Sequence, residues 1–131
     1  MITFQNPPGL AKPSGFSHVA TSTRRKTVHI SGQVAYSADG QVVGVGDLAA
    51  QVEQVYINIG LALAACGGSF SDVVKTTLYV RDMTPEKIRV IREVRSRFLA
   101  AEPPASTMVG VQALARPELL LEVDAVACMN E

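Results

Sequence analysis

Two carboxylates near the end of the chain, Glu122 and Asp124, have the type and spacing of an acid/base pair. They lie in the apolar run 118–128, whose alternation predicts a β-strand with Leu121 and Val123 on one face and both acids on the other. At about 3.3 Å per residue, the two positions are roughly 7 Å apart. Burial raises a carboxyl pKa, so either acid could act as a general acid or base. The alternative is an interface carboxylate that an arginine or backbone amides satisfy.

Hydroxyl groups near glycine and proline turns are the next candidates for ligand contacts. Ser31 precedes Gly32 inside an alternating strand pattern, and Ser106 and Thr107 follow Pro104. A glycine within a strand predicts a bulge or a close backbone approach. The chain has no GxSxG or GxGxxG motif, so neither a serine hydrolase nor a nucleotide-binding loop is indicated.

Two helices and about six strands must position these residues. Asp47 caps a predicted helix that Gly67 and Gly68 end, and Thr84-Pro85 begins a second helix that ends before Pro103-Pro104. The pattern predicts a loop or extended arm over residues 1–15 and strands over residues 16–22, 27–36, 41–45, 73–80, 106–112 and 118–128. This order predicts a single α+β domain, residues 1–131, with a mixed sheet and both helices on one face.

The opposite face of that sheet has no helix left to cover it. We expect Leu120, Val126 and Met108 to lie there beside the two acids. An apolar face of this kind is covered most economically by another copy of the chain. The pattern therefore predicts a homo-oligomer with functional clefts between its subunits.

Composition limits the partners of the chain. Twelve basic residues balance twelve acidic ones, so no overall field attracts nucleic acid or a membrane surface, and neither partner is expected. The four arginines of the second helix are interpreted as its solvated surface (Arg89, Arg92, Arg95 and Arg97). No signal-peptide pattern is present and no apolar run is taken to reach membrane-spanning length, so a cytoplasmic location is expected. His18 and His29 have no metal-ligand spacing, and no metal is predicted.

Three segments occur in an order that is specific when they are taken together. They are ISGQVA at 30–35, ACGGSFSDVVKTTLYVRDM at 65–83, and PAST…LLLEVDAVA at 104–127. In these segments the chain resembles the YjgF/RidA family from about residue 16 to its end. The resemblance implies a chorismate-mutase-like α+β subunit and a homotrimer with small-molecule clefts at its three interfaces. It also implies that the protein requires neither a metal nor an organic cofactor.

The resemblance also implies a chemistry, the hydrolysis of reactive enamines or imines to 2-oxo acids and ammonia. In that scheme a glutamate on the last strand positions the attacking water, and it matches Glu122. The arginine that grips the substrate carboxylate is absent, because Ser106 stands at its position. A tyrosine near the start of the family pattern is matched by Phe16, and an asparagine of the second helix has no counterpart. Arg116 is the candidate to replace the missing cation.

The sequence thus predicts an intersubunit cleft with Glu122 as the acid/base of a possible deaminase-like hydrolase. Its predicted substrate-binding residues are Phe16, Ser31, Gly32, Ser106 and Met108. The alternative is a non-catalytic trimer that binds a metabolite or regulates a partner. A role in RNA cleavage, also linked to the family, ranks last because the chain is neutral and lacks a stacking platform.

Overall fold

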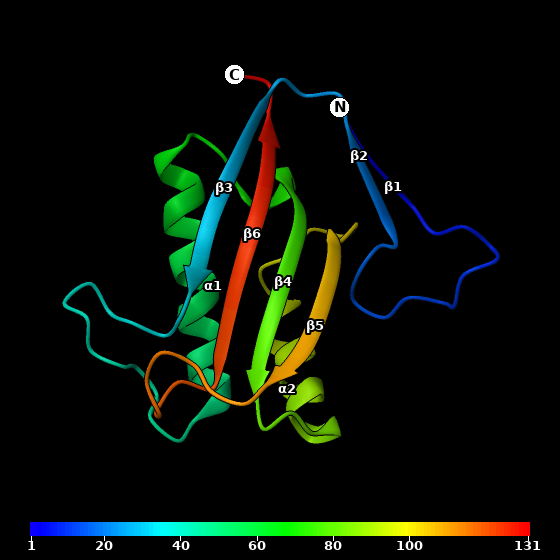
Figure 1. Cartoon of the computed structure of the whole chain (residues 1–131). Coiled ribbons are helices and arrows are strands. Elements are labelled where there is room, and N and C mark those ends of the chain that lie inside the picture. Colours follow the sequence, from blue (N-terminus) through cyan, green and yellow to red (C-terminus); the bar gives the residue numbers. More distant parts are fainter.

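A computed structural model describes residues 1–131, with both helices packed on one face of a four-stranded sheet (Figure 1). The sheet has the order β3-β6-β4-β5, in which β4 and β5 are parallel and the other pairs antiparallel. Its strands are β3 (Lys26–Gln33), β4 (Val73–Arg81), β5 (Ala105–Val111) and β6 (Leu121–Met129). A separate antiparallel pair, β1 (Ile2–Gln5) with β2 (Val19–Ser22), lies beside the main sheet.

Both helices begin where the sequence predicts. Asp47 precedes α1 (Leu48–Ala65), and its side chain accepts a hydrogen bond from the Ala50 amide at 3.1 Å. Thr84 precedes α2 (Pro85–Arg95) and accepts from the Lys87 amide at 3.2 Å. Such caps satisfy amides that have no partner inside the helix.

The core lies between the helices and the sheet. On β6 the buried side chains alternate with half-buried ones, so that Leu121 and Val123 face the helices while Glu122 and Asp124 face outward. Val52, Val55 and Ile59 of α1 pack in the same core. The α+β class with two helices on one face is confirmed, and the six strands divide into a four-stranded and a two-stranded sheet.

Two expectations about the first half of the chain are corrected. Ile2–Gln5 is a strand rather than part of a loop, because its backbone pairs with β2 from Ile2↔Ser22 to Gln5↔Val19. The turn-forming prolines and glycines that follow hid this short alternation. Residues 41–45 form only a single bridge, Tyr36↔Val42, instead of a strand.

Helix α1 has close to the bounds that its caps predict, but contrary to the sequence interpretation it is long and apolar enough to count as a membrane-spanning length. Its 18 residues have a mean hydropathy of 1.2, enough by length and composition to cross a membrane, and a third of it (33%) is buried within the chain. A helix whose buried stripe packs on a sheet gives the same signal. The buried residues Val52, Val55 and Leu63 provide that packing here.

A buried glutamine, Gln51, joins α1 to the segments before and after it. Its Nε2 donates to the Gly44 carbonyl at 3.1 Å and the Glu118 carbonyl at 2.8 Å, and its Oε1 accepts from the Leu120 amide at 2.9 Å. The side chain is fully buried, so a substitution would leave three backbone groups without partners.

Replacing Gln51 with leucine is therefore expected to lower the free energy of unfolding by about 2–4 kcal/mol. Urea denaturation monitored by circular dichroism measures this loss. Gln41→Leu, at an exposed position, is the control and should unfold near the wild-type midpoint. Equal midpoints for the two variants would contradict the role given to the Gln51 hydrogen bonds.

Candidate functional site

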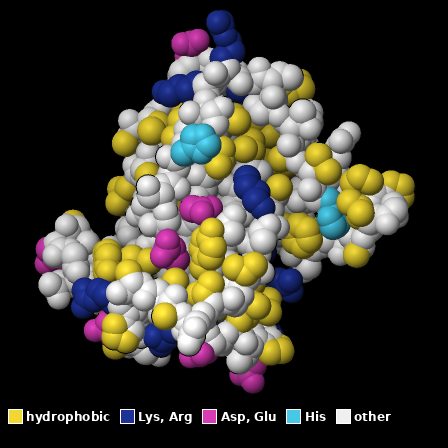
Figure 2. All heavy atoms as spheres, viewed as in Figure 1, with side chains coloured by type: hydrophobic (Ala, Val, Ile, Leu, Met, Phe, Trp, Pro, Cys, Tyr) yellow, Lys and Arg dark blue, Asp and Glu magenta, His cyan; other side chains and the backbone are white.

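The two acids of β6 lie next to each other on the face of the sheet that no helix covers. Cross-strand pairing places Glu122 beside Tyr79 and Asp124 beside Thr77 of β4. Both carboxylates are half-buried. Figure 2 shows acidic atoms together near the middle of this face, with apolar and basic side chains around them. The predicted orientation of the acid pair is confirmed.

A glycine lets Glu122 lie against the neighbouring strand. The register of β3 with β6 shifts between Ile30 and Gln33, so Ser31 and Gly32 form a bulge there. A Cβ atom added to Gly32 would lie 1.9 Å from the Glu122 Oε2, which no real structure tolerates. The sequence predicted a bulge or a close approach at this glycine, and both occur.

Asp124 is held by a partner that Glu122 lacks. The Tyr79 hydroxyl donates to the Asp124 Oδ2 at 3.2 Å. Ser31, Gly32 and Asp124 also line an open depression of about 250 Å³. No side-chain hydrogen bond or ion pair within the chain engages Glu122, which leaves its carboxylate free to hold a water or a ligand.

The charge of Asp124 raises the pKa of Tyr79 above its ordinary value of 10.0, with smaller effects of desolvation, the hydrogen bond and Glu122. The folded protein then holds the phenol proton more tightly than the unfolded chain does. This contribution to stability is fully present below pH 10 and is lost as the pH rises through the raised pKa.

Replacing Asp124 with asparagine is expected to return the Tyr79 pKa toward its ordinary value, because the main cause of the shift is removed. Absorbance at the phenolate band, followed between pH 8 and 13, measures the titration. Tyr79→Phe identifies which step belongs to this residue. Burial raises the pKa of Tyr56 to about 12, so a late transition that belongs to Tyr56 is expected in every variant. An unchanged Tyr79 titration in Asp124→Asn would contradict the assignment.

A second group of predicted site residues lies at the other edge of the sheet. Phe16 lines a hollow of about 410 Å³ with Asn6 and Pro103. The next residue, Ser17, is buried and bridges in parallel to Ala105 at the start of β5. This bridge places the segment that contains Phe16 next to the start of β5, where Ser106 lies.

The expected orientation of Met108 is wrong. In the register of β4 with β5, Met108 pairs with the buried Leu78, and its side chain packs against the core on the helix side. Ser106 shares that side, where its hydroxyl accepts from the Thr76 Oγ1 at 3.1 Å. Neither residue shares a face with Glu122. The sequence did not show this, because the alternation of an edge strand does not say which of its two faces is turned inward.

The predicted site residues therefore form two groups in one chain. Ser31 and Gly32 lie with Glu122 by the β3 edge, whereas Phe16 and Ser106 lie by the β5 edge. β6 and β4 separate the two edges, so the single chain does not join these groups into one cleft.

Two expectations about arginines also change. Arg116 follows the end of β5, whereas Ser106 is near its start, so within one chain Arg116 cannot supply a cation beside Ser106. Instead its Nε lies 3.6 Å from the Glu118 Oε1, and its guanidinium lies over the Tyr36 ring. Arg95, expected on the solvated surface of α2, is buried. The helix carried a partial signal for this, because Arg95 lies four residues after the buried Ile91 and directly after the buried Val94.

Comparison with known proteins identifies the family. The model of the family described as Endoribonuclease L-PSP matches residues 9–129. The chain belongs to this family. It shares 32% identity over 121 residues with "3-aminoacrylate deaminase RutC" of Acinetobacter baylyi, covering 92% of this chain and 90% of that protein. With "Protein DfrA" of Myxococcus xanthus it shares 35% identity over 102 residues, 78% of this chain and 76% of that one.

Solved structures agree with the family assignment. The fold matches that of the Rid-family protein YyfB of Yersinia pestis, described as of unknown function, with a TM-score of 0.91 and 39% identity over 98% of both chains. RidA of an Antarctic Psychrobacter matches with a TM-score of 0.71 and 28% identity, over 97% of this chain and 98% of that one. The resemblance of the three sequence segments to the YjgF/RidA family is thereby confirmed.

Proposed function

We propose that this member of the L-PSP (YjgF/RidA) family is a homotrimer that binds a small molecule between subunits and hydrolyses an enamine or imine there. The observation that carries the proposal is the Glu122 carboxylate, which is half-buried beside Gly32 on an uncovered sheet face and engaged by no group of its own chain. In this position it can orient a water for attack on an electrophilic carbon.

The division of the predicted site into two groups supports an intersubunit cleft. The β3 edge of one subunit carries Glu122, Gly32 and Ser31, and the β5 edge of a neighbour would contribute Phe16 and Ser106. Val109, 37% exposed on the outward face of β5, supplies apolar surface for such a contact. A cytoplasmic trimer without a metal or organic cofactor is part of the proposal.

The reaction follows from the chemistry of the substrate. Water adds to the C=N carbon of the imine, and Glu122 accepts the proton that this water loses. Glu122 passes this proton to the imine nitrogen, which gives a neutral carbinolamine. As the C–N bond breaks, the carbinolamine hydroxyl loses its proton through Glu122 to the departing nitrogen, so that ammonia leaves and a C=O product remains. Atoms balance as one water consumed and one ammonia released.

A second candidate is a binding trimer without turnover. The sequence resemblance matches Ser106 to the arginine of the family pattern, and the Ser106 hydroxyl already accepts from Thr76. A serine supplies no charge to a substrate carboxylate, so a carboxylate-bearing imine would be held less firmly.

Light scattering coupled to size-exclusion chromatography tests the assembly, and a mass of three chains is expected. Ammonia release from enzymatically generated 2-aminoacrylate, and separately from 3-aminoacrylate, tests the reaction against samples without protein. A monomer would contradict the cleft. Rates equal to the uncatalysed ones, together with metabolite-induced thermal stabilisation in a ligand screen, would favour the binding trimer instead.

A further inference from the structure

Arg95, the last residue of α2, is a buried cation without an acidic partner. Only 3% of the residue is exposed. The ion pairs of the chain engage other arginines, and Arg95 makes one hydrogen bond, from its Nη2 to the Gly15 carbonyl at 3.2 Å. Its Nε is buried and has no partner. A guanidinium carries five donors, so most of its hydrogen-bonding capacity is unused.

The surroundings of Arg95 leave its charge largely uncompensated. Burial lowers the pKa of Arg95, the nearby Tyr56 opposes this effect, and the positive charge of Arg92 adds to it. The C-terminal end of α2 offers only partial negative charges to the guanidinium. Charged groups held away from water are costly unless an opposite charge pairs with them, so this position favours an anion.

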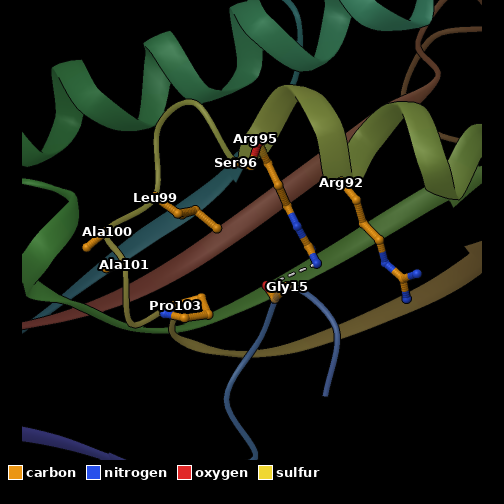
Figure 3. Close-up of a pocket in the computed structure, with 8 residues that line it drawn as sticks. All are labelled: Gly15, Arg92, Arg95, Ser96, Leu99, Ala100, Ala101 and Pro103. Carbon is orange, nitrogen blue, oxygen red and sulfur yellow. Dashed lines mark hydrogen bonds between the residues drawn. The ribbon is translucent and has the colours of Figure 1, made fainter. Parts of the chain in front are cut away.

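A cavity lies against this guanidinium. Its volume is about 190 Å³, less than that of typical sites for drug-sized ligands. Figure 3 shows Arg95 pointing toward Gly15 and Arg92 extending beside it from the same helix, with Leu99 and Pro103 across the cavity. We call it the Arg95 pocket, lined by Gly15, Arg92, Arg95, Ser96, Leu99, Ala100, Ala101 and Pro103.

We propose that the Arg95 pocket binds the carboxylate group of a small aliphatic carboxylic acid. The planar guanidinium matches a carboxylate in two-point geometry, and Arg92 adds a second positive charge. The wall formed by Leu99, Ala100 and Pro103 suits a short hydrocarbon chain and offers nothing to inorganic phosphate. The pocket lies on the helix side of the sheet, away from Glu122, so this binding does not require the proposed hydrolysis.

Titration calorimetry with butyrate tests the pocket in the intact protein. Butyrate is expected to bind once per chain and at least about tenfold more tightly than butyramide, which has the same shape without the charge. Inorganic phosphate is the third ligand and is expected to bind more weakly than butyrate. Arg95→Met, which keeps the apolar stem, should weaken butyrate binding about tenfold or more.

Variants outside the core keep the test independent of folding. Arg92→Gln, at an exposed position, should weaken butyrate binding about threefold. Arg89→Gln, exposed on the same helix but outside the pocket, and Glu122→Gln should bind butyrate as the wild type does. Equal affinity for butyrate and butyramide, tighter binding of phosphate, or full butyrate affinity in Arg92→Gln would each overturn the proposal. Loss of ammonia release in Glu122→Gln with butyrate binding intact separates this site from the proposed function.

Discussion

Replacing Glu122 with glutamine is expected to lower ammonia release from 2-aminoacrylate by about 100-fold or more, the usual contribution of a positioned acid/base. Glutamine has the same size and still fits beside Gly32, but it cannot accept the proton of the attacking water. Spectrophotometric coupling of ammonia to a dehydrogenase measures the rate. Circular dichroism and light scattering confirm that fold and assembly are unchanged.

Asp124→Asn is the matched control for this experiment, because Asp124 lies on the same face and already accepts from Tyr79. Its rate is expected to stay close to that of the wild type. If Asp124→Asn loses the activity while Glu122→Gln keeps it, the roles of the two acids are reversed. If neither variant changes a measurable rate, the reaction does not use this carboxylate pair.

Replacing Gly32 with alanine is expected to displace the Glu122 side chain, whose carboxylate occupies the space of the new methyl group. The new Cβ would lie 1.9 Å from the Glu122 Oε2 and 2.7 Å from its carboxyl carbon, so either the side chain or the β3 bulge must move. Because the collision is with the far end of a flexible side chain, the loss of folding free energy is expected at the low end of the range for overpacking, about 1 kcal/mol. Urea denaturation measures the loss, and the displaced carboxylate should lower the hydrolysis rate as well.

A double-mutant cycle isolates the contact. Adding Glu122→Ala to Gly32→Ala removes the atoms that collide, so most of the lost stability is expected to return. Gly110→Ala is the strand control, because its added methyl makes only ordinary contacts near 3.5 Å with Met83. Additive losses in the cycle, or an equal loss in Gly110→Ala, would show that the cost at Gly32 comes from the backbone.

Local signals in the sequence were sufficient for much of the fold. The capping side chains of Asp47 and Thr84 are short-range devices, and both helices begin after them. The alternation of β6 also placed Glu122 on the face opposite Leu121. In each case the neighbours that decide the structure lie within a few residues along the chain.

The misplaced residues depend on contacts between distant segments. Met108 lies in a short edge strand whose inward face is decided by its parallel pairing with Leu78, thirty positions earlier. Arg95 is buried because the segment that carries Gly15 returns to the end of α2 and its carbonyl accepts the guanidinium. A helical pattern records the periodicity of its own residues and not the approach of a remote loop.

The serine that bridges to β5 has a consequence for solubility. Pro103 and Pro104 precede this edge strand and have no amide hydrogens to donate. Their carbonyls accept from Ser17, one from its hydroxyl at 2.6 Å and the other from its amide at 3.0 Å. A strand of another molecule cannot pair with these two residues, because they have no amide donors and their carbonyls are already hydrogen-bonded to Ser17. This end of the parallel edge is therefore protected against the strand addition that begins aggregation.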